Sequence, residues 1–415
     1  MVKMTRAASV TALVGLALGI ATLVAASPAR AIGTSDQAAS ILYWPKVVSN
    51  SSTDTLIRLE NVHTSQPTQA HCYYIDANSH CSNNPTQICD PQRAECGAGA
   101  CVPGWMEIDF DVVLTFEQPL MWQASKGLRR SDLPLVPGKP PVLGGACNEN
   151  GLPCGFSYPG CTCNFGQTNA GTGIPPVPET PFVGALQCIQ YAAPQGSIPA
   201  RPDNQAGATN KLIGQATFVT GGGSGPGGVS LDAASYNATG LRFKAPEAGV
   251  PSNQLRLDDI QYDSCPTVLV LDHVFDNPPG AAQAPWGNNV TDLTLVPCGN
   301  NFAQQIPGSV TAQFLVFNEY EQRFSTTRAV PCFLESPLSL LDTTNPTRSI
   351  FSMQVAGTYA GQTRIRPVGN ASTGRGLVGA AWLQTDVFGS AAYNLHQSGS
   401  PSFSGGLQPD IITLP

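Results

Sequence analysis

Apolar and polar residues alternate in short runs along most of the chain, and this pattern predicts β-strands. The runs contain β-branched or aromatic residues and are bounded by Gly, Pro, Asn and Ser, which favour turns. In the first part of the chain, the predicted strands span residues 41–48, 55–61, 69–75, 106–116, 182–191, 212–219 and 238–243. In the second part, they span residues 268–274, 291–296, 311–317, 327–334, 350–358, 362–366, 376–384, 391–396 and 410–414.

About seven short strands in each part, separated by turns, is the number that an antiparallel β-sandwich needs. Beyond the N-terminus no long run suggests a helix, so the pattern predicts an all-β fold. Residues 244–254, rich in Ala, Pro, Gly and Ser, are the predicted linker. The sequence therefore predicts two tandem immunoglobulin-like β-sandwich domains, at residues 32–254 and 255–415.

The second part of the chain repeats short patterns of the first part in the same order. Each part has a strand that ends in Asn and is followed by a Cys, namely Asn61 with Cys72 and Asn318 with Cys332. Four further matches follow along the chain, which are 108–112 with 350–355, 184–188 with 361–365, 212–216 with 377–381, and 234–237 with 391–394. Five matches in one order predict that the two domains are related.

The first domain is longer because it carries insertions. The sequence places these at about residues 80–104 and 125–181, and each holds four cysteines. Long loops without secondary structure are usually functional or disordered, but the cysteines favour ordered loops braced by disulfides. The Gly-rich run at 221–228 predicts a flexible hairpin tip.

The N-terminus has the pattern of an export signal. Lys3 and Arg6 precede an apolar run at 7–26, and Ala29 and Ala31 give the small residues that signal peptidase prefers. An uncleaved anchor is the alternative, because about 20 apolar residues can span a bilayer. The Ala-x-Ala ending favours cleavage after residue 31. We expect export by the general secretory route to the periplasm, the cell surface or the medium, with no membrane span after cleavage.

Composition and charge narrow the classes of partner. Removal of residues 1–31 takes away three basic residues and no acid, which moves the formal net charge from −7 to −10. An acidic chain without a basic run is a poor candidate for binding nucleic acid. Only 12% of the residues are charged, whereas 42 are Gly and 36 are Pro, a balance that favours strands and loops.

All 13 cysteines follow the predicted signal, so disulfides are the default expectation. Each cluster of four can close on itself, and Cys265 is left as the odd residue and the candidate free thiol. The twelve disulfide candidates are Cys72, Cys188, Cys81, Cys89, Cys96, Cys101, Cys147, Cys154, Cys161, Cys163, Cys298 and Cys332. Connectivity is not determined by the sequence.

Two groups of carboxylates are candidates for chemistry. Asp109 and Asp111 alternate with apolar residues, which places them on one face of a strand, about 7 Å apart. Such a pair could serve a glycosidase or hold Ca²⁺, although a solvated strand face explains it as well. Asp258, Asp259 and Asp263 follow the linker and are the better calcium candidates, but they lack the spacing of an EF-hand loop.

The remaining candidate residues give weaker indications. The five histidines are scattered and none forms the i, i+4 pair of a zinc protease, and no Gly-x-Ser-x-Gly motif marks a serine nucleophile. Trp105 and Trp122 are candidates for stacking on a sugar, although tryptophan in a strand usually belongs to the core. We therefore assign no catalytic residue, metal ligand or cofactor from the sequence.

The leading hypothesis from the sequence is a secreted or cell-surface structural or adhesion-type protein without enzymatic activity. Its first domain would present disulfide-braced loops to a protein or glycan partner, because binding residues tend to lie on loops held by a rigid scaffold. A carbohydrate-binding or calcium-dependent module is the second hypothesis. A secreted hydrolase is the third.

Overall fold

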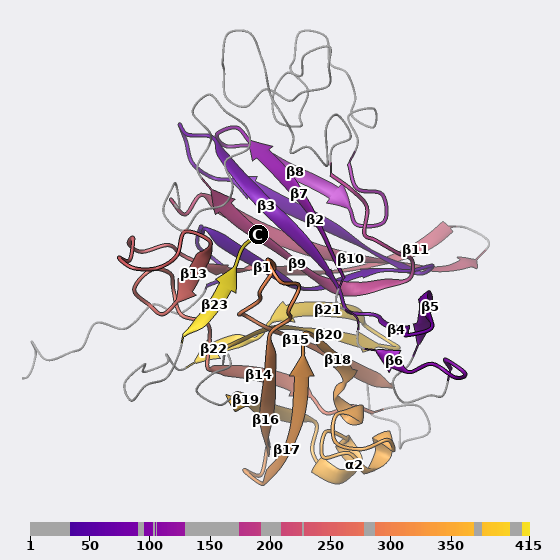
Figure 1. Cartoon of the computed structure of the whole chain (residues 1–415). Coiled ribbons are helices and arrows are strands. Elements are labelled where there is room, and N and C mark those ends of the chain that lie inside the picture. Colours follow the sequence, from indigo (N-terminus) through magenta and orange to yellow (C-terminus); the bar gives the residue numbers. More distant parts are fainter. Residues whose placement is uncertain are drawn as a thin grey trace, which may run out of the picture. The chain divides into compact units, whose positions relative to one another are not determined.

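The computed structural model describes residues 34–89, 95–102, 104, 106–128, 174–191, 209–225, 228–277, 287–368, 376–398 and 409–415. These residues form an all-β protein built from antiparallel sheets (Figure 1). All described residues belong to one compact unit of the chain. Three of the predictions concern residues outside the described ranges. They are the export signal, the candidate Trp105, and the second cysteine cluster, which consists of Cys147, Cys154, Cys161 and Cys163.

The first sandwich is made of nine of the described strands. They are β1 (Ile41–Ser49), β2 (Thr53–Asn61), β3 (Thr68–Asp76), β7 (Met106–Leu114), β8 (Pro119–Gln123), β9 (Phe182–Tyr191), β10 (Leu212–Gly225), β11 (Gly228–Asn237) and β12 (Thr239–Leu241). One layer has the order β12-β1-β9-β3-β7 and the other has the order β8-β2-β10-β11. A single pairing, of Ser49 with Asp54, joins the two layers at a corner.

The core of the first sandwich lies between these layers. Leu42 and Trp44 of β1 are buried in the same apolar cluster as Ile57 and Leu59 of β2. Alternation along each strand explains this arrangement, since residues two apart share a face of the sheet. Strand β1 is buried along its whole length, because its other face contacts a second apolar cluster.

The second sandwich is made of nine further described strands. They are β14 (Val268–Val274), β15 (Asn289–Pro297), β16 (Ser309–Asn318), β17 (Arg323–Pro331), β18 (Leu334–Pro337), β19 (Ala360–Val368), β20 (Leu377–Thr385), β21 (Gly389–Asn394) and β22 (His396–Ser398). Their layers have the orders β17-β16-β19-β14-β22 and β18-β15-β20-β21. The core between them includes Leu271, Leu295, Phe314, Ile365 and Leu377.

The two sandwiches have the same strand order, and of the described strand pairs in the first sandwich all but β1–β2 have a counterpart in the second. Each strand of the first sandwich corresponds to one strand of the second, taken in order along the chain. The strands β14 through β22 thus match β1, β2, β3, β7, β8, β9, β10, β11 and β12. Seven antiparallel strand pairs of the first sandwich have a counterpart in the second. They are β1–β9, β1–β12, β3–β9, β3–β7, β2–β10, β2–β8 and β10–β11. A common origin for the two sandwiches remains an inference from this likeness.

This correspondence agrees with three of the five sequence matches. Three matched pairs of segments lie on corresponding strands. These pairs are 184–188 on β9 with 361–365 on β19, 212–216 on β10 with 377–381 on β20, and 234–237 on β11 with 391–394 on β21. The match of Asn61 with Asn318 is out of step by one strand, because β2 corresponds to β15 and not to β16. Residues 108–112 lie on β7, whose counterpart is β17 and not the segment 350–355.

The strand predicted at 350–358 is wrong, because Met353–Ala356 form the short helix α2. The Ser352 side chain caps this turn by accepting a hydrogen bond from the backbone N–H of Gln354, and Gly357 ends it with a φ of 69°. The segment is apolar enough for a strand, but its local capping residues favour a helical turn. The short helices η2 (Leu338–Leu340) and η3 (Pro346–Arg348) precede it.

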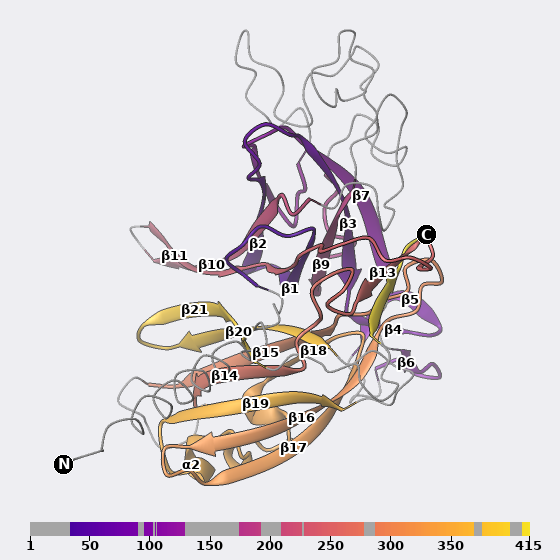
Figure 2. The ribbon, with the colours of Figure 1, turned by 90° about the vertical axis from the view of Figure 1, so that its left-hand side faces the viewer.

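Side chains of the two sandwiches also contact one another. Trp382 of β20 is buried in the core cluster of the first sandwich, where its ring centroid lies 4.9 Å from that of Phe218. Figure 2 shows β20 and β21 between the strands of the first sandwich and the layer that contains β16 and β17. A second shared cluster includes Tyr43, Tyr73 and Phe302, together with residues of the paired strands β13 (Gln254–Leu257) and β23 (Asp410–Thr413). The domain boundary at residue 254 stays a prediction.

Candidate functional site

The disulfides of the first sandwich agree with the predicted candidates. Cys72 on β3 is bonded to Cys188 on β9, its direct partner in the same layer. This bond lies within one layer, whereas the characteristic disulfide of immunoglobulin domains joins the two sheets. Two further disulfides close the first cysteine cluster on itself, and they are Cys81–Cys96 and Cys89–Cys101.

The candidate free thiol is different from the one that the sequence suggested. Cys265 is bonded to Cys298, and among the described cysteines Cys332 is the free one. Cys265 lies three residues before β14 and Cys298 lies one residue after β15, so the fold brings them together in a way that spacing alone does not reveal. Cys332 is buried, and burial raises the pKa of its thiol to about 12, which keeps it protonated and unreactive.

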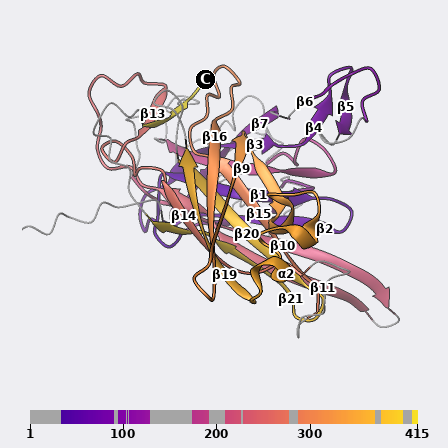
Figure 3. The same ribbon diagram turned by 90° about the horizontal axis from the view of Figure 1, so that it is seen from below.

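The first cysteine cluster forms a small sheet of its own. This Cys-rich insertion consists of β4 (Ser79–Cys81), β5 (Asn84–Cys89) and β6 (Cys101–Val102) and lies between β3 and β7. Residues 84–87 of β5 are exposed. In the second sandwich the corresponding strands β16 and β17 are joined by the tight turn 319–322. Figure 3 shows the insertion at one edge of the structure.

Asp109 and Asp111 lie on one face of β7, as predicted, and both bind the same histidine. His71 of β3 is 2.8 Å from Asp111 through its Nδ1 and 3.1 Å from Asp109 through its Nε2. Burial acts to lower the pKa of His71, but the hydrogen bonds that it donates to both carboxylates outweigh burial, so that the pKa is raised to about 9. His71 is therefore a cation at neutral pH and stacks edge-on against Tyr73.

This arrangement does not resemble the two carboxylates of a glycosidase. Such an enzyme needs one carboxylic acid to donate a proton and a second carboxylate to act as base or nucleophile on a sugar held between them. Here the space between Asp109 and Asp111 is filled by the imidazolium of His71. The hydrogen bond from His71 lowers the pKa of Asp109, so this group stays ionised and is a poor general acid.

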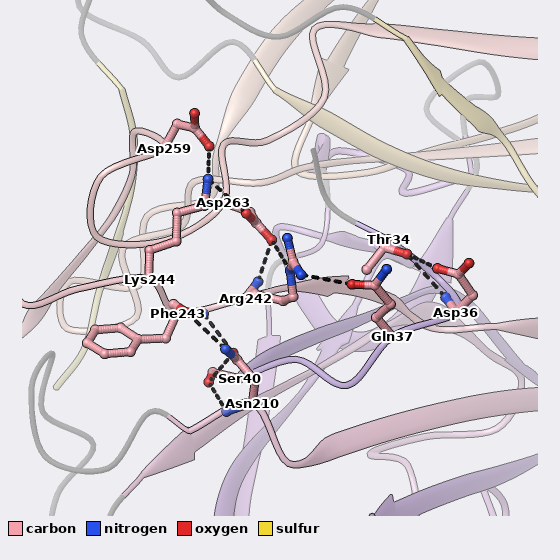
Figure 4. Close-up of polar contacts among 10 residues, drawn as sticks. All are labelled: Thr34, Asp36, Gln37, Ser40, Asn210, Arg242, Phe243, Lys244, Asp259 and Asp263. Atoms are coloured by element: carbon pink, nitrogen blue, oxygen red, sulfur yellow. Dashed lines mark hydrogen bonds and ion pairs between the residues drawn. The ribbon is translucent and has the colours of Figure 1, made fainter. Parts of the chain in front are cut away.

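Basic side chains and the backbone engage the three aspartates that follow the predicted linker. Figure 4 shows Asp259 and Asp263 with their basic partners. Asp263 is buried and accepts a hydrogen bond from Arg242 Nε at 3.1 Å, and Lys244 is 3.2 Å away. Lys244 also contacts Asp259. Asp258 caps the next turn by accepting bonds from two backbone N–H groups. Calcium prefers several oxygen ligands without competing cations, so this group does not fit a calcium site.

The described tryptophans belong to cores and not to an exposed sugar-binding face. Trp122 is only 2% exposed, and its Nε1 donates a hydrogen bond of 2.6 Å to the Tyr74 hydroxyl. Trp44 and Trp382 are also buried. The burial of Trp122 removes one of the two candidates for stacking on a sugar, and the other, Trp105, lies outside the described residues.

A cluster that the sequence analysis missed lies where the Cys-rich insertion leaves the first sandwich. Asp76 ends β3, His80 belongs to β4, and Glu179 precedes β9. One ligand atom from each of these residues lies within 4.8 Å of the other two. His80 Nε2 is 3.0 Å from Glu179 Oε2. Asp76 is fully buried, and burial raises the pKa of its carboxyl to about 7.

Comparison of the chain with protein-family models and with curated proteins found no match in either. Within the described residues, no helix has the length and apolar character needed to cross a membrane.

Proposed function

We propose that this chain is an exported binding or structural protein without enzymatic activity, and that the Cys-rich insertion is its main contact surface. The observation that carries the proposal is the difference between the two sandwiches at one hairpin. A four-residue turn is sufficient to join β16 to β17, whereas the insertion between β3 and β7 has its own sheet and two disulfides.

Two properties of the insertion fit a contact surface. Its disulfides join cysteines that are 15 and 12 positions apart in the sequence, which reduces the conformational entropy that the insertion would lose on binding. Residues 84–87 project polar and apolar groups into solvent from a braced strand. Surface loops on a rigid scaffold are the usual carriers of binding residues.

Export is supported by the signal-like N-terminus and by the disulfides, because disulfides form and persist in oxidising compartments. A glycan or a protein at the cell surface is the expected partner class. The hydrolase alternative has no specific support, because His71 fills the space between Asp109 and Asp111. The calcium alternative has none either, because basic side chains and the backbone engage the aspartates after the linker.

The test is binding of purified protein, residues 32–415, to cells of the producing organism from which the gene has been deleted. The N84K/T86K/Q87K variant adds three positive charges to the exposed strand of the insertion. A matched control, S325K/T327K, changes two exposed residues of β17 in the second sandwich. We expect the insertion variant to lose at least tenfold in bound protein and the control to bind as the unaltered protein does. Equal loss in both variants, or no binding by the unaltered protein, would overturn the proposal.

A further inference from the structure

The geometry points to a divalent-cation site formed by Asp76, His80 and Glu179, at the base of the Cys-rich insertion. We infer a transition-metal ion of the zinc type as its occupant. This inference goes beyond the proposed function, because it holds or fails whether or not the insertion contacts a partner.

The donor atoms already lie close to the arrangement that a metal requires. In a tetrahedral zinc site with bonds of about 2.0–2.1 Å, neighbouring donor atoms are about 3.3 Å apart. His80 Nε2 and Glu179 Oε2 are 3.0 Å apart, and all three donor atoms lie within 4.8 Å of one another. Small side-chain rotations would therefore place three ligands around one ion and leave a fourth position for water.

Asp76 provides a second and independent observation. The side chain is fully buried, and its Oδ1 accepts a hydrogen bond of 2.9 Å from the backbone N–H of Asn78. The other oxygen, Oδ2, is buried and has no hydrogen-bond partner. A buried carboxylate oxygen without a partner is costly, and coordination of a cation would satisfy it.

Asn78 holds the third ligand in place. Its Nδ2 donates a hydrogen bond to Glu179 Oε1 and another, of 2.8 Å, to the backbone carbonyl of Pro181. The remaining oxygen of Glu179 is the one that lies next to His80. Metal-binding carboxylates are usually oriented by such outer hydrogen bonds.

The second sandwich shows how the same place is built without charge. Asp76 is opposite Gly184 in the β3–β9 pairing, and Asn318 is opposite Gly361 in the β16–β19 pairing. Asn318 therefore occupies the position of Asp76. Its Nδ2 donates hydrogen bonds of 2.8 Å to the side chain of Gln322 and to the backbone carbonyl of Ala356.

The two neighbours of Asn318 also correspond to the two neighbours of Asp76. Gln322 is four residues after Asn318, just as His80 is four residues after Asp76. Ala356 is five residues before its strand glycine, just as Glu179 is. A neutral, fully hydrogen-bonded group is thus sufficient for this turn. The first sandwich replaces it with three ionisable ligands, a change that turn formation does not require.

The mixture of ligands indicates which ions fit. Imidazole nitrogen favours zinc and other late transition metals, whereas calcium and magnesium prefer oxygen ligands alone. With neutral His80, two carboxylates would balance the charge of one divalent ion. A proton shared between the buried carboxyl of Asp76 and the partly exposed carboxyl of Glu179 is the competing explanation, and it requires no metal.

The test uses residues 32–415 purified with a chelator and then dialysed against zinc, with the metal content measured by mass spectrometry and the affinity by calorimetry. D76N/H80Q converts the two positions to the residues of the second sandwich. H71Q removes a histidine that lies elsewhere on β3, outside the cluster, and serves as the control. Circular dichroism checks that each variant is folded.

We expect one zinc ion per chain in the unaltered protein and in H71Q, and at least a tenfold weaker affinity in D76N/H80Q. Calcium should bind much more weakly than zinc. Absence of bound zinc in the folded unaltered protein, or equal affinity in D76N/H80Q, would overturn the inference and favour the shared proton. Neither result depends on the cell-binding assay, so the two proposals can fail separately.

Discussion

The two sandwiches share all of their described strand pairs except β1–β2, yet they are stabilised differently at equivalent positions. In the first, Cys72 and Cys188 face each other across β3 and β9 and form a disulfide. In the second, the corresponding pair across β16 and β19 is Phe314 with Ile365, which are both fully buried. The same place in the fold is thus held by a covalent bond in one copy and by apolar packing in the other.

The difference extends to charge. The face of β3 and β7 that carries His71 and its two aspartates corresponds to a face of β16 and β17 with Gln313, Ser325 and Thr327. The ionisable cluster at the base of the insertion also has a neutral counterpart. The second sandwich therefore indicates what the fold alone requires, and the first indicates what has been added to it.

Equivalent strands also meet each other. Asn237 ends β11 and Asn394 ends its counterpart β21, and the side chain of Asn394 accepts a hydrogen bond of 3.1 Å from the backbone N–H of Asn237. The same side chain donates to the Asn237 carbonyl. Lys46 of the first sandwich is buried, pairs with Glu335 of the second, and lies 5.3 Å from the Trp382 ring. The contact between the sandwiches thus combines polar, ionic and apolar groups.

The largest expected effect is loss of the Cys72–Cys188 disulfide. C72V/C188V gives the first sandwich an apolar pair like that of the second while it removes the crosslink. A disulfide that spans 116 residues restricts the unfolded chain strongly, so we expect the free energy of unfolding to fall by about 2–5 kcal/mol. Urea unfolding followed by tryptophan fluorescence measures this change.

The control for this experiment is C81A/C96A, which opens a disulfide inside the insertion. The insertion can lose its order without unfolding either sandwich, so the main transition should shift by less than about 1 kcal/mol. If both variants unfold at the same urea concentration as the unaltered protein, apolar packing alone holds β3 to β9, and the two sandwiches are stabilised in the same way.

Much of the fold follows from the sequence, because alternation depends on local residues. The predicted strands at 182–191 and 268–274 coincide with β9 and β14. The sequence does not predict strand β11, which begins at Gly228, the last residue of the Gly-rich run interpreted as a flexible hairpin tip. Its backbone pairing with β10 requires no particular side chains. The layer order also could not be predicted, since β1 pairs with β9 across more than a hundred residues.

The cluster of Asp76, His80 and Glu179 could not be predicted for the same reason. Glu179 is 99 residues from His80 along the chain and approaches it only because β3 pairs with β9. Asp76 and His80 are four residues apart, a spacing that by itself is only weak evidence for a metal site. The sequence repeat also paired Asn318 with Asn61, which is the same residue type but lies on β2, a strand that does not correspond to β16. The equivalence of Asp76 and Asn318 therefore could not be recognised from the sequence. The equivalent residue, Asp76, differs from Asn318 only in its carboxylate.

Two equivalent glycines should respond differently to substitution. Gly184 lies opposite Asp76, and Gly361 lies opposite Asn318. A Cβ atom at position 184 would lie 2.0 Å from the backbone carbonyl oxygen of Ile75, which cannot move without disturbing β3. A Cβ atom at position 361 would lie 2.7 Å from Cζ of Phe275, an atom of a side chain and not of the backbone. We therefore expect G184A to destabilise the protein by about 2–3 kcal/mol and G361A by about 1 kcal/mol. Thermal unfolding of both variants at one scan rate makes the comparison. A larger loss in G361A would mean that the second sandwich is packed more rigidly than the first at this position.

The smallest expected effect is the pH dependence that His71 gives to the first sandwich alone. The pKa of His71 is raised from 6.5 to about 9 in the folded protein. The stabilisation from its contacts with Asp109 and Asp111 is therefore complete below about pH 6.5 and is lost as the pH rises through 9. Partial exposure of Asp109 weakens the interaction, so we expect about 1–2 kcal/mol over this interval.

Urea unfolding at several pH values between 6 and 10 tests this in the unaltered protein and in H71Q, which places the glutamine of the second sandwich at position 71. Other groups titrate in the same interval, so the informative quantity is the difference between the two proteins at each pH. That difference should shrink as the pH rises. H396Q, at a histidine whose side chain is 75% exposed, should follow the unaltered protein throughout. A difference that does not change with pH would mean that His71 contributes packing and hydrogen bonds but no charge, and the two sandwiches would then differ at this face only in shape.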